Sequence, residues 1–184
     1  SFSTITVQDA ESRFTERELS TLENGFSRLC SSSSASGSDW VDEDTFQYFL
    51  LSEFPCMPSV LAKRLFLTWD VDNNSKLAFS EFLCGLCIIT RGNAEERLEF
   101  LFRFYDLGEQ GVITKDTLLR FDELVRETSS YKNEDHWTGL AMVEEAFATS
   151  FLATGGKVSN CELEFPEFRK WGFNYLGSPL LSWT

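Results

Sequence analysis

The chain has 184 residues, 42% hydrophobic and 15% aromatic, which is enough apolar material for a packed core and argues against a disordered chain. Its 29 acidic residues outnumber 16 basic ones, and the net charge of −13 excludes a nucleic-acid binder, because phosphate binding needs clustered Lys and Arg. The acidic excess suits a bound cation or a basic protein partner, although an ordinary solvated surface explains it equally well.

The ends of the sequence and its cysteines indicate the setting. The chain starts at Ser1 without an initiator Met and stops on the apolar tail Leu180–Thr184, so we expect a segment cut from a longer protein. No apolar run approaches the roughly 20 residues of a membrane span, so no transmembrane segment is expected. Five dispersed cysteines read as reduced thiols and predict a cytoplasmic protein. Cys84 and Cys87 form a C-x-x-C, but they lie in a helical pattern and are better read as small core residues than as zinc ligands.

Four segments, taken in chain order, fit one twelve-residue loop template. They are residues 34–45, 70–81, 106–117 and 156–167, at intervals of 36, 36 and 50 residues. Each carries an apolar residue at its eighth position, where an EF-hand loop pairs with its neighbour; these residues are Val41, Leu77, Ile113 and Leu163. The longer last interval holds a polar linker, residues 126–135.

The flanks of these loops follow helical periodicity. Apolar residues recur every three or four positions, in the sets Leu61, Leu65, Trp69; Phe79, Phe82, Leu83, Leu86, Ile89; Leu98, Leu101, Phe102, Tyr105; Leu118, Leu119, Phe121, Leu124, Val125; and Met142, Ala146, Phe147, Phe151. Residues 91–93 interrupt this pattern, and Asn93 with Glu96 forms a predicted capping box.

The predicted fold is therefore all-α, with four EF-hand helix-loop-helix units in two paired lobes. Short β-bridges are expected between paired loops, through Val41 with Leu77 and Ile113 with Leu163. We place an N-terminal pair at residues 1–90, a C-terminal pair at 91–176 and an apolar tail or linker at 177–184.

One loop, residues 70–81, keeps a credible set of calcium ligands. Calcium takes six to eight oxygen ligands, and the position-12 carboxylate supplies two of them. The predicted ligands are Asp70, Asp72, Asn74, the backbone carbonyl of Lys76, and Glu81. Position 6 is Ser75, where a left-handed backbone favours Gly, so we expect weak sensor-type affinity of about 1–100 μM, with Mg²⁺ as a competitor.

The other three loops are predicted to hold no ion. The third has Gly108, Gln110 and Thr117 where the second has Asp72, Asn74 and Glu81. In the fourth, Glu167 remains, but Gly156 and Val158 remove the first two ligands, and the first is serine-rich and ends in Thr45. These loops are expected to act as structural partners.

The run from Trp69 to Asp106 resembles the neuronal calcium sensor and calcineurin B group. The resemblance rests on the second loop with its Phe79-Ser80-Glu81-Phe82 ending, on Thr90-Arg91-Gly92, Glu95-Glu96-Arg97-Leu98 and Phe104-Tyr105-Asp106. It implies two EF-hand pairs with a hydrophobic groove for partner helices. Similar modules also lie at the amino-terminal ends of larger enzymes, such as NADPH oxidases and ubiquitin-specific proteases.

Two functions follow as hypotheses. The first is a calcium-binding regulatory module that docks an amphipathic helix, or a neighbouring domain of the same chain, in an apolar groove. The alternative is a calcium-independent pseudo-EF-hand scaffold that regulates a larger enzyme. We expect no catalysis in this segment, because the single histidine, His136, lies in a polar linker and Gly155-Gly156-Lys157 does not fit a phosphate-binding loop.

Overall fold

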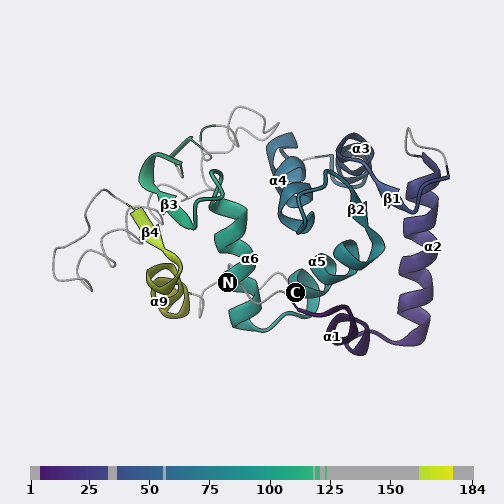
Figure 1. Cartoon of the computed structure of the whole chain (residues 1–184), viewed down its shortest axis with the longest axis horizontal. Helices are drawn as coiled ribbons and strands as arrows, with labels where there is room; N and C mark the ends of the chain where they lie inside the picture. The colour runs from purple at the N-terminus through teal and green to yellow at the C-terminus, as the bar shows by residue number, and fades with distance from the viewer. Residues whose placement is uncertain are drawn as a thin grey trace. The chain divides into compact units, whose positions relative to one another are not determined.

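Helices joined by tight loops account for most of the chain that the structure, a computed structural model, describes (Figure 1). It describes residues 5–32, 37–55, 57–117, 119–120, 123 and 162–175. The fold divides into two compact units, residues 1–96 and 97–184, which are treated one at a time below. Within the described ranges, no helix is long and apolar enough to cross a membrane.

The first unit contains two consecutive helix-loop-helix arrangements. Its elements are α1 (Val7–Ser12), α2 (Glu16–Ser32), β1 (Trp40–Val41), α3 (Glu43–Glu53), α4 (Ser59–Trp69), β2 (Leu77–Ala78) and α5 (Phe79–Arg91). A polar side chain caps the start of α3, where the Asp42 carboxylate accepts a hydrogen bond from the Thr45 N–H at 2.7 Å. β1 and β2 pair antiparallel with Val41 opposite Leu77, which confirms the predicted bridge.

An aromatic cluster fills the centre of this unit. Phe46 from α3 and Phe66 from α4 are fully buried, and their ring centroids are 5.8 Å apart. Trp69 at the end of α4 meets Phe46 and Phe82 edge-on, with centroid distances of 5.4 and 5.7 Å. Gly85 on α5 faces the same indole so closely that an added Cβ would lie 2.5 Å from three Trp69 ring atoms. The end of α4 and the middle of α5 therefore pack through a contact that only glycine permits.

A short N-terminal helix, which the sequence did not predict, packs against α5. Ala10 of α1 is fully buried against Leu83 and Cys87. Arg13 reaches from the end of α1 to Glu96 through two hydrogen bonds of 2.6 and 2.7 Å. Glu96 is also the N3 residue of α6 (Ala94–Tyr105), where it accepts from the Asn93 N–H at 2.9 Å. The predicted capping box is confirmed, since the Asn93 side chain in turn accepts from the Glu96 N–H at 3.0 Å.

The second unit is described in part, and it repeats the paired-loop arrangement. It holds most of α6, β3 (Val112–Thr114), β4 (Glu162–Glu164) and α9 (Phe165–Tyr175). β3 and β4 pair antiparallel with Ile113 opposite Leu163, as predicted, and both side chains are almost fully buried. Phe102 of α6 contacts Phe165 and Phe168, each with a centroid distance of 5.4 Å.

Four complete EF-hand units stay a prediction. The mostly helical structure and the two loop bridges fit an EF-hand-like fold. The helix predicted over residues 142–151, the linker 126–135 and the tail 177–184 lie outside the described residues, as does most of the helix predicted over residues 118–125. The predicted boundary at residues 90–91 also stays a prediction.

Candidate metal centre

The loop between α4 and α5 is organised around the Asp70 carboxylate. Asp70 ends α4, where its N–H donates to the Phe66 carbonyl at 2.9 Å, and its residue surface is only 2% exposed. One carboxylate oxygen accepts from the Asn74 N–H at 3.1 Å, and the other accepts from the Ser75 N–H at 2.8 Å. This side chain therefore folds the first half of the loop back on itself.

Two residues of the loop adopt the left-handed conformation. Asn73 has φ 55° and Ser75 has φ 61°. The value at Ser75 confirms the predicted left-handed turn at position 6, which costs a side-chain-bearing residue about 1 kcal/mol. Asn tolerates this region better than most residues, so Asn73 fits its position. The hydrogen bonds that Asp70 accepts from the Asn74 and Ser75 N–H groups offset the strain and hold these two groups toward the centre of the loop.

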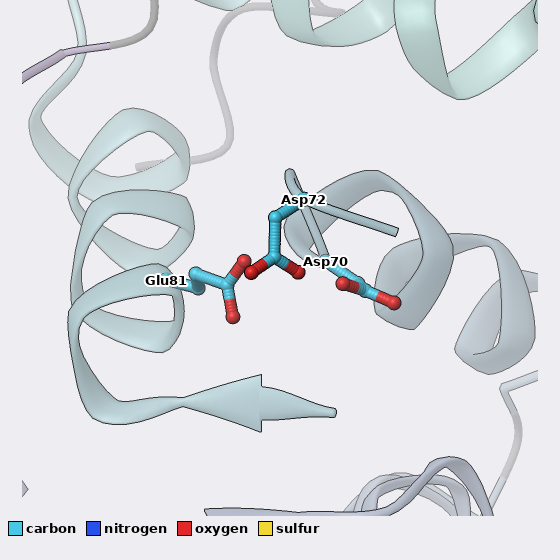
Figure 2. A group of neighbouring side chains, drawn as sticks. All are labelled: Asp70, Asp72 and Glu81. Carbon is cyan, nitrogen blue, oxygen red and sulfur yellow. The ribbon is translucent and has the colours of Figure 1, made fainter. Parts of the chain in front are cut away.

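Three carboxylates converge at this point (Figure 2). Asp70, Asp72 and Glu81 each offer an oxygen, and these oxygens all lie within 4.8 Å of one another. Burial raises the pKa of the Asp70 carboxyl, its backbone donors Ser75 and Asn74 oppose that rise, and the neighbouring Asp72 adds to it. Three acidic groups this close repel each other unless a cation or proton intervenes. Carboxylate oxygens at this spacing are ligands suited to a hard divalent ion.

Glu81, the predicted closing ligand, is hydrogen-bonded at both edges of the loop. One oxygen accepts from the Val71 N–H at 3.0 Å, and the other accepts from the Ala78 N–H at 3.0 Å. The second bond caps the start of α5, which begins at Phe79. This capping function was not predicted from the sequence, although a Glu three residues into a helix is a known signal for it.

The two remaining predicted ligands belong to the same hydrogen-bonded loop. The Asn74 side-chain amide donates to Asp72 at 2.8 Å, and its carbonyl oxygen accepts from the Lys76 N–H at 2.7 Å. Asn74 thus lies beside the carboxylates. Ligation by the Lys76 backbone carbonyl stays a prediction.

The third loop has the same backbone organisation without the ligands. Asp106, 6% exposed, accepts from the Gln110 N–H at 3.1 Å and from the Gly111 N–H at 2.7 Å, as Asp70 does from Asn74 and Ser75. Glu109 and Gly111 have φ of 52° and 76°, matching Asn73 and Ser75 one repeat earlier. At the closing position, the Thr117 N–H donates to the Thr114 hydroxyl at 3.0 Å. One inward carboxylate remains where the second loop has three.

This chain is similar to known proteins. A calcium-binding protein of Dictyostelium discoideum, named NCSA, is 34% identical over 107 residues, which is 58% of this chain and 54% of that protein. The chain thus spans about half the length of the curated relative that it matches. The model of the family described as the USP32 N-terminal domain matches residues 9–111, a segment that includes the whole 70–81 loop.

The two matches assign this chain to a family. The relative is a calcium-binding protein and the matched family is an N-terminal domain, so this segment is not itself an enzyme. The family model covers more than half of the 184 residues. The chain therefore belongs to the USP32 N-terminal domain family.

Proposed function

We propose that this chain is a calcium-binding regulatory domain with one competent EF-hand loop, residues 70–81. The observation that carries the proposal is the convergence of Asp70, Asp72 and Glu81, whose oxygens lie within 4.8 Å of one another. The similarity to a calcium-binding protein supports calcium as the ion. Asn74 and the Lys76 carbonyl complete the proposed set, and a water fills the position next to Ala78, which has no oxygen in its side chain.

The site is a weak one by this reasoning, and Mg²⁺ competes for it. Ser75 has φ 61°, a left-handed conformation that costs a side-chain-bearing residue about 1 kcal/mol. Mg²⁺ prefers octahedral geometry and retains several waters, so it uses fewer of these ligands than calcium does. We expect a micromolar calcium affinity that a millimolar Mg²⁺ background reduces.

Glu81 provides the route from ion binding to the rest of the unit. The Glu81 carboxylate accepts hydrogen bonds from the Val71 and Ala78 N–H groups, and so links the start of the loop to the start of α5. Glu81 would hold the ion with its carboxylate, and because it lies in the first turn of α5, a change in its contacts would be passed to that turn. Phe79 and Phe82, from that turn, pack in the aromatic cluster against Phe26 with centroid distances of 5.5 and 5.2 Å. Such a change would alter the apolar surface that an amphipathic partner helix or a neighbouring domain contacts.

Calorimetric titration of calcium into chelator-treated protein tests the proposal, with tryptophan emission read in parallel. Trp69 directly precedes the first ligand and reports on the aromatic cluster. We expect one micromolar site that Glu81→Gln abolishes. Glu23→Gln, the same charge change at an exposed residue of α2, is the matched control and leaves the site intact. The absence of both heat and thermal stabilisation at millimolar calcium would rule out the ion-binding function.

A second candidate is a scaffold that docks its partner irrespective of calcium. The third loop favours this reading, because it keeps the loop backbone with a single inward carboxylate. The family description as an N-terminal domain agrees with a position ahead of a catalytic region, such as an oxidase or a ubiquitin-specific protease. The two candidates differ in one observable: calcium changes hydrophobic-dye binding and tryptophan emission in a regulatory domain, but raises only the melting temperature of a scaffold.

A further inference from the structure

A lysine of the metal loop lies over an indole ring that comes from the preceding loop. Lys76 Nζ is 4.6 Å from the centroid of the Trp40 ring. Trp40 is in β1 opposite Ala78 of β2, so the strand pair holds this ring beside the residue that precedes β2. The Ser38 hydroxyl also donates to the Trp40 carbonyl at 2.9 Å, which fixes the start of β1.

The carboxylates of the metal loop are close to Lys76 in sequence. Lys76 belongs to the same twelve-residue loop as the three converging carboxylates. A lysine ammonium is a compact charge on a flexible four-carbon stem, and it pairs readily with nearby carboxylates. Among the ion pairs of the described residues, however, none joins Lys76 to Asp70, Asp72 or Glu81. The Trp40 ring provides the alternative contact.

We propose that Trp40 is a positioning residue for the metal site. It holds the Lys76 ammonium on its ring, so that this internal cation does not occupy the carboxylates that calcium needs. The inference rests on the proposed function of the 70–81 loop. By this route the first loop, which was predicted to bind no ion, contributes to the affinity of the second loop through a side chain that is not a ligand.

The size of the effect follows from the strength of the contact. At an exposed site, a cation–π contact favours the stacked position over an unstacked one by about two- to fivefold. Without the ring, the ammonium populates the carboxylate position more often by at most that factor. The apparent dissociation constant for calcium then rises by no more than the same factor, about two to five, because the competent state is less populated.

A double-mutant cycle on the whole chain tests this. Calcium is titrated at low ionic strength into the wild type, Trp40→Leu, Lys76→Met and the double variant. We expect Trp40→Leu to weaken calcium binding by a measurable factor of up to about five, and Lys76→Met to bind at least as tightly as the wild type. The double variant is expected to match Lys76→Met, because the indole has no ammonium to hold. Trp40→Phe keeps an aromatic face and is expected to restore part of the loss.

A readout without metal checks the contact itself. In the ion-free protein, NMR is expected to show the Lys76 ε-methylene protons shifted upfield by the indole ring current, and Trp40→Leu is expected to remove that shift. An unshifted resonance in the wild type overturns the proposal. The proposal is also overturned if Trp40→Leu lowers the calcium affinity of the Lys76→Met variant as much as it lowers that of the wild type. That result would mean that Trp40 acts through packing and not through Lys76. A wild type that binds no calcium overturns the proposed function along with this inference, whereas binding with no coupling in the cycle overturns the inference alone.

Discussion

The contact between Gly85 and Trp69 allows a sharp test of the packing in the first unit. Gly85 lies within α5, where alanine is intrinsically better than glycine by about 1 kcal/mol. A Cβ there would lie 2.5 Å from three ring atoms of Trp69, and this ring is only 6% exposed and bounded by Phe46 and Phe82. The ring cannot step aside freely, and overpacking a core of this kind costs about 1–3 kcal/mol. Gly85→Ala is therefore expected to lower the free energy of unfolding, by about 1 kcal/mol net.

The chain provides a matched control for this substitution. Gly25 lies within α2, and a Cβ added there meets nothing within 4 Å. Gly25→Ala gains the same helix propensity without the clash, so we expect it to raise the free energy of unfolding by about 0.5–1 kcal/mol.

Urea unfolding followed by far-UV circular dichroism measures both variants, with the m-value checked against the wild type. The difference between the free energies of unfolding of Gly25→Ala and Gly85→Ala is the cost of overpacking. If Gly85→Ala proves as stable as Gly25→Ala, the close approach of α5 to the indole is wrong.

Three further predictions concern the loop bridge, a helix cap and acid stability. Leu77→Ala removes a fully buried side chain at the bridge between the first two loops, and we expect a loss of about 2–5 kcal/mol in urea unfolding together with weaker calcium binding in calorimetry. Asn93→Ala removes the N-cap of α6 and is expected to cost about 1 kcal/mol by the same unfolding assay, whereas Asn93→Ser is expected to restore most of it. The Arg91 guanidinium lowers the pKa of Glu18 to about 2, with Thr15 adding to the effect, and Arg13 lowers the pKa of Glu96. Because these folded-state pKa values lie below the ordinary value, both carboxylates stabilise the fold above about pH 4.5, and that stability is lost as pH falls toward the folded values. Urea midpoints from pH 7 to 3 are expected to fall less steeply for Arg91→Gln than for the wild type, and parallel curves would contradict the assignment.

The parts of the site that were predictable from sequence are those with a fixed position in a repeat. Leu77 and Ile113 were expected to meet Val41 and Leu163 because all four occupy the eighth position of a loop template, and the observed registers agree. Asp70, Asp72 and Glu81 were picked by the same spacing, and the structure brings their oxygens together.

Contacts that depend on side chains meeting through space were not predictable. The sequence from Val7 to Ser12 is too short and too polar for periodicity to indicate a helix, yet Ala10 is fully buried against α5. The bidentate contact of Arg13 with Glu96 joins residues 83 positions apart, and no local pattern pairs them. The Lys76 contact with Trp40 likewise depends on strand pairing that aligns two loops.

The second and third loops share a backbone conformation, although the third lacks most of the ligands of the second, so loop shape does not depend on a full set of ligands. The Asp106 side chain supports the left-handed turn pattern of the third loop, since its two oxygens accept from the Gln110 and Gly111 N–H groups. A loop of this kind can lose its other ligands and keep its shape, because the carboxylate at its first position accepts hydrogen bonds from the loop backbone. A metal site could then be built into the third loop by side-chain substitutions alone. Gly108→Asp, Gln110→Asn and Thr117→Glu would give it the side-chain ligands of the second loop on a backbone of the same conformation. In this domain the two loops therefore differ in the charge that they present and not in the fold of their backbone.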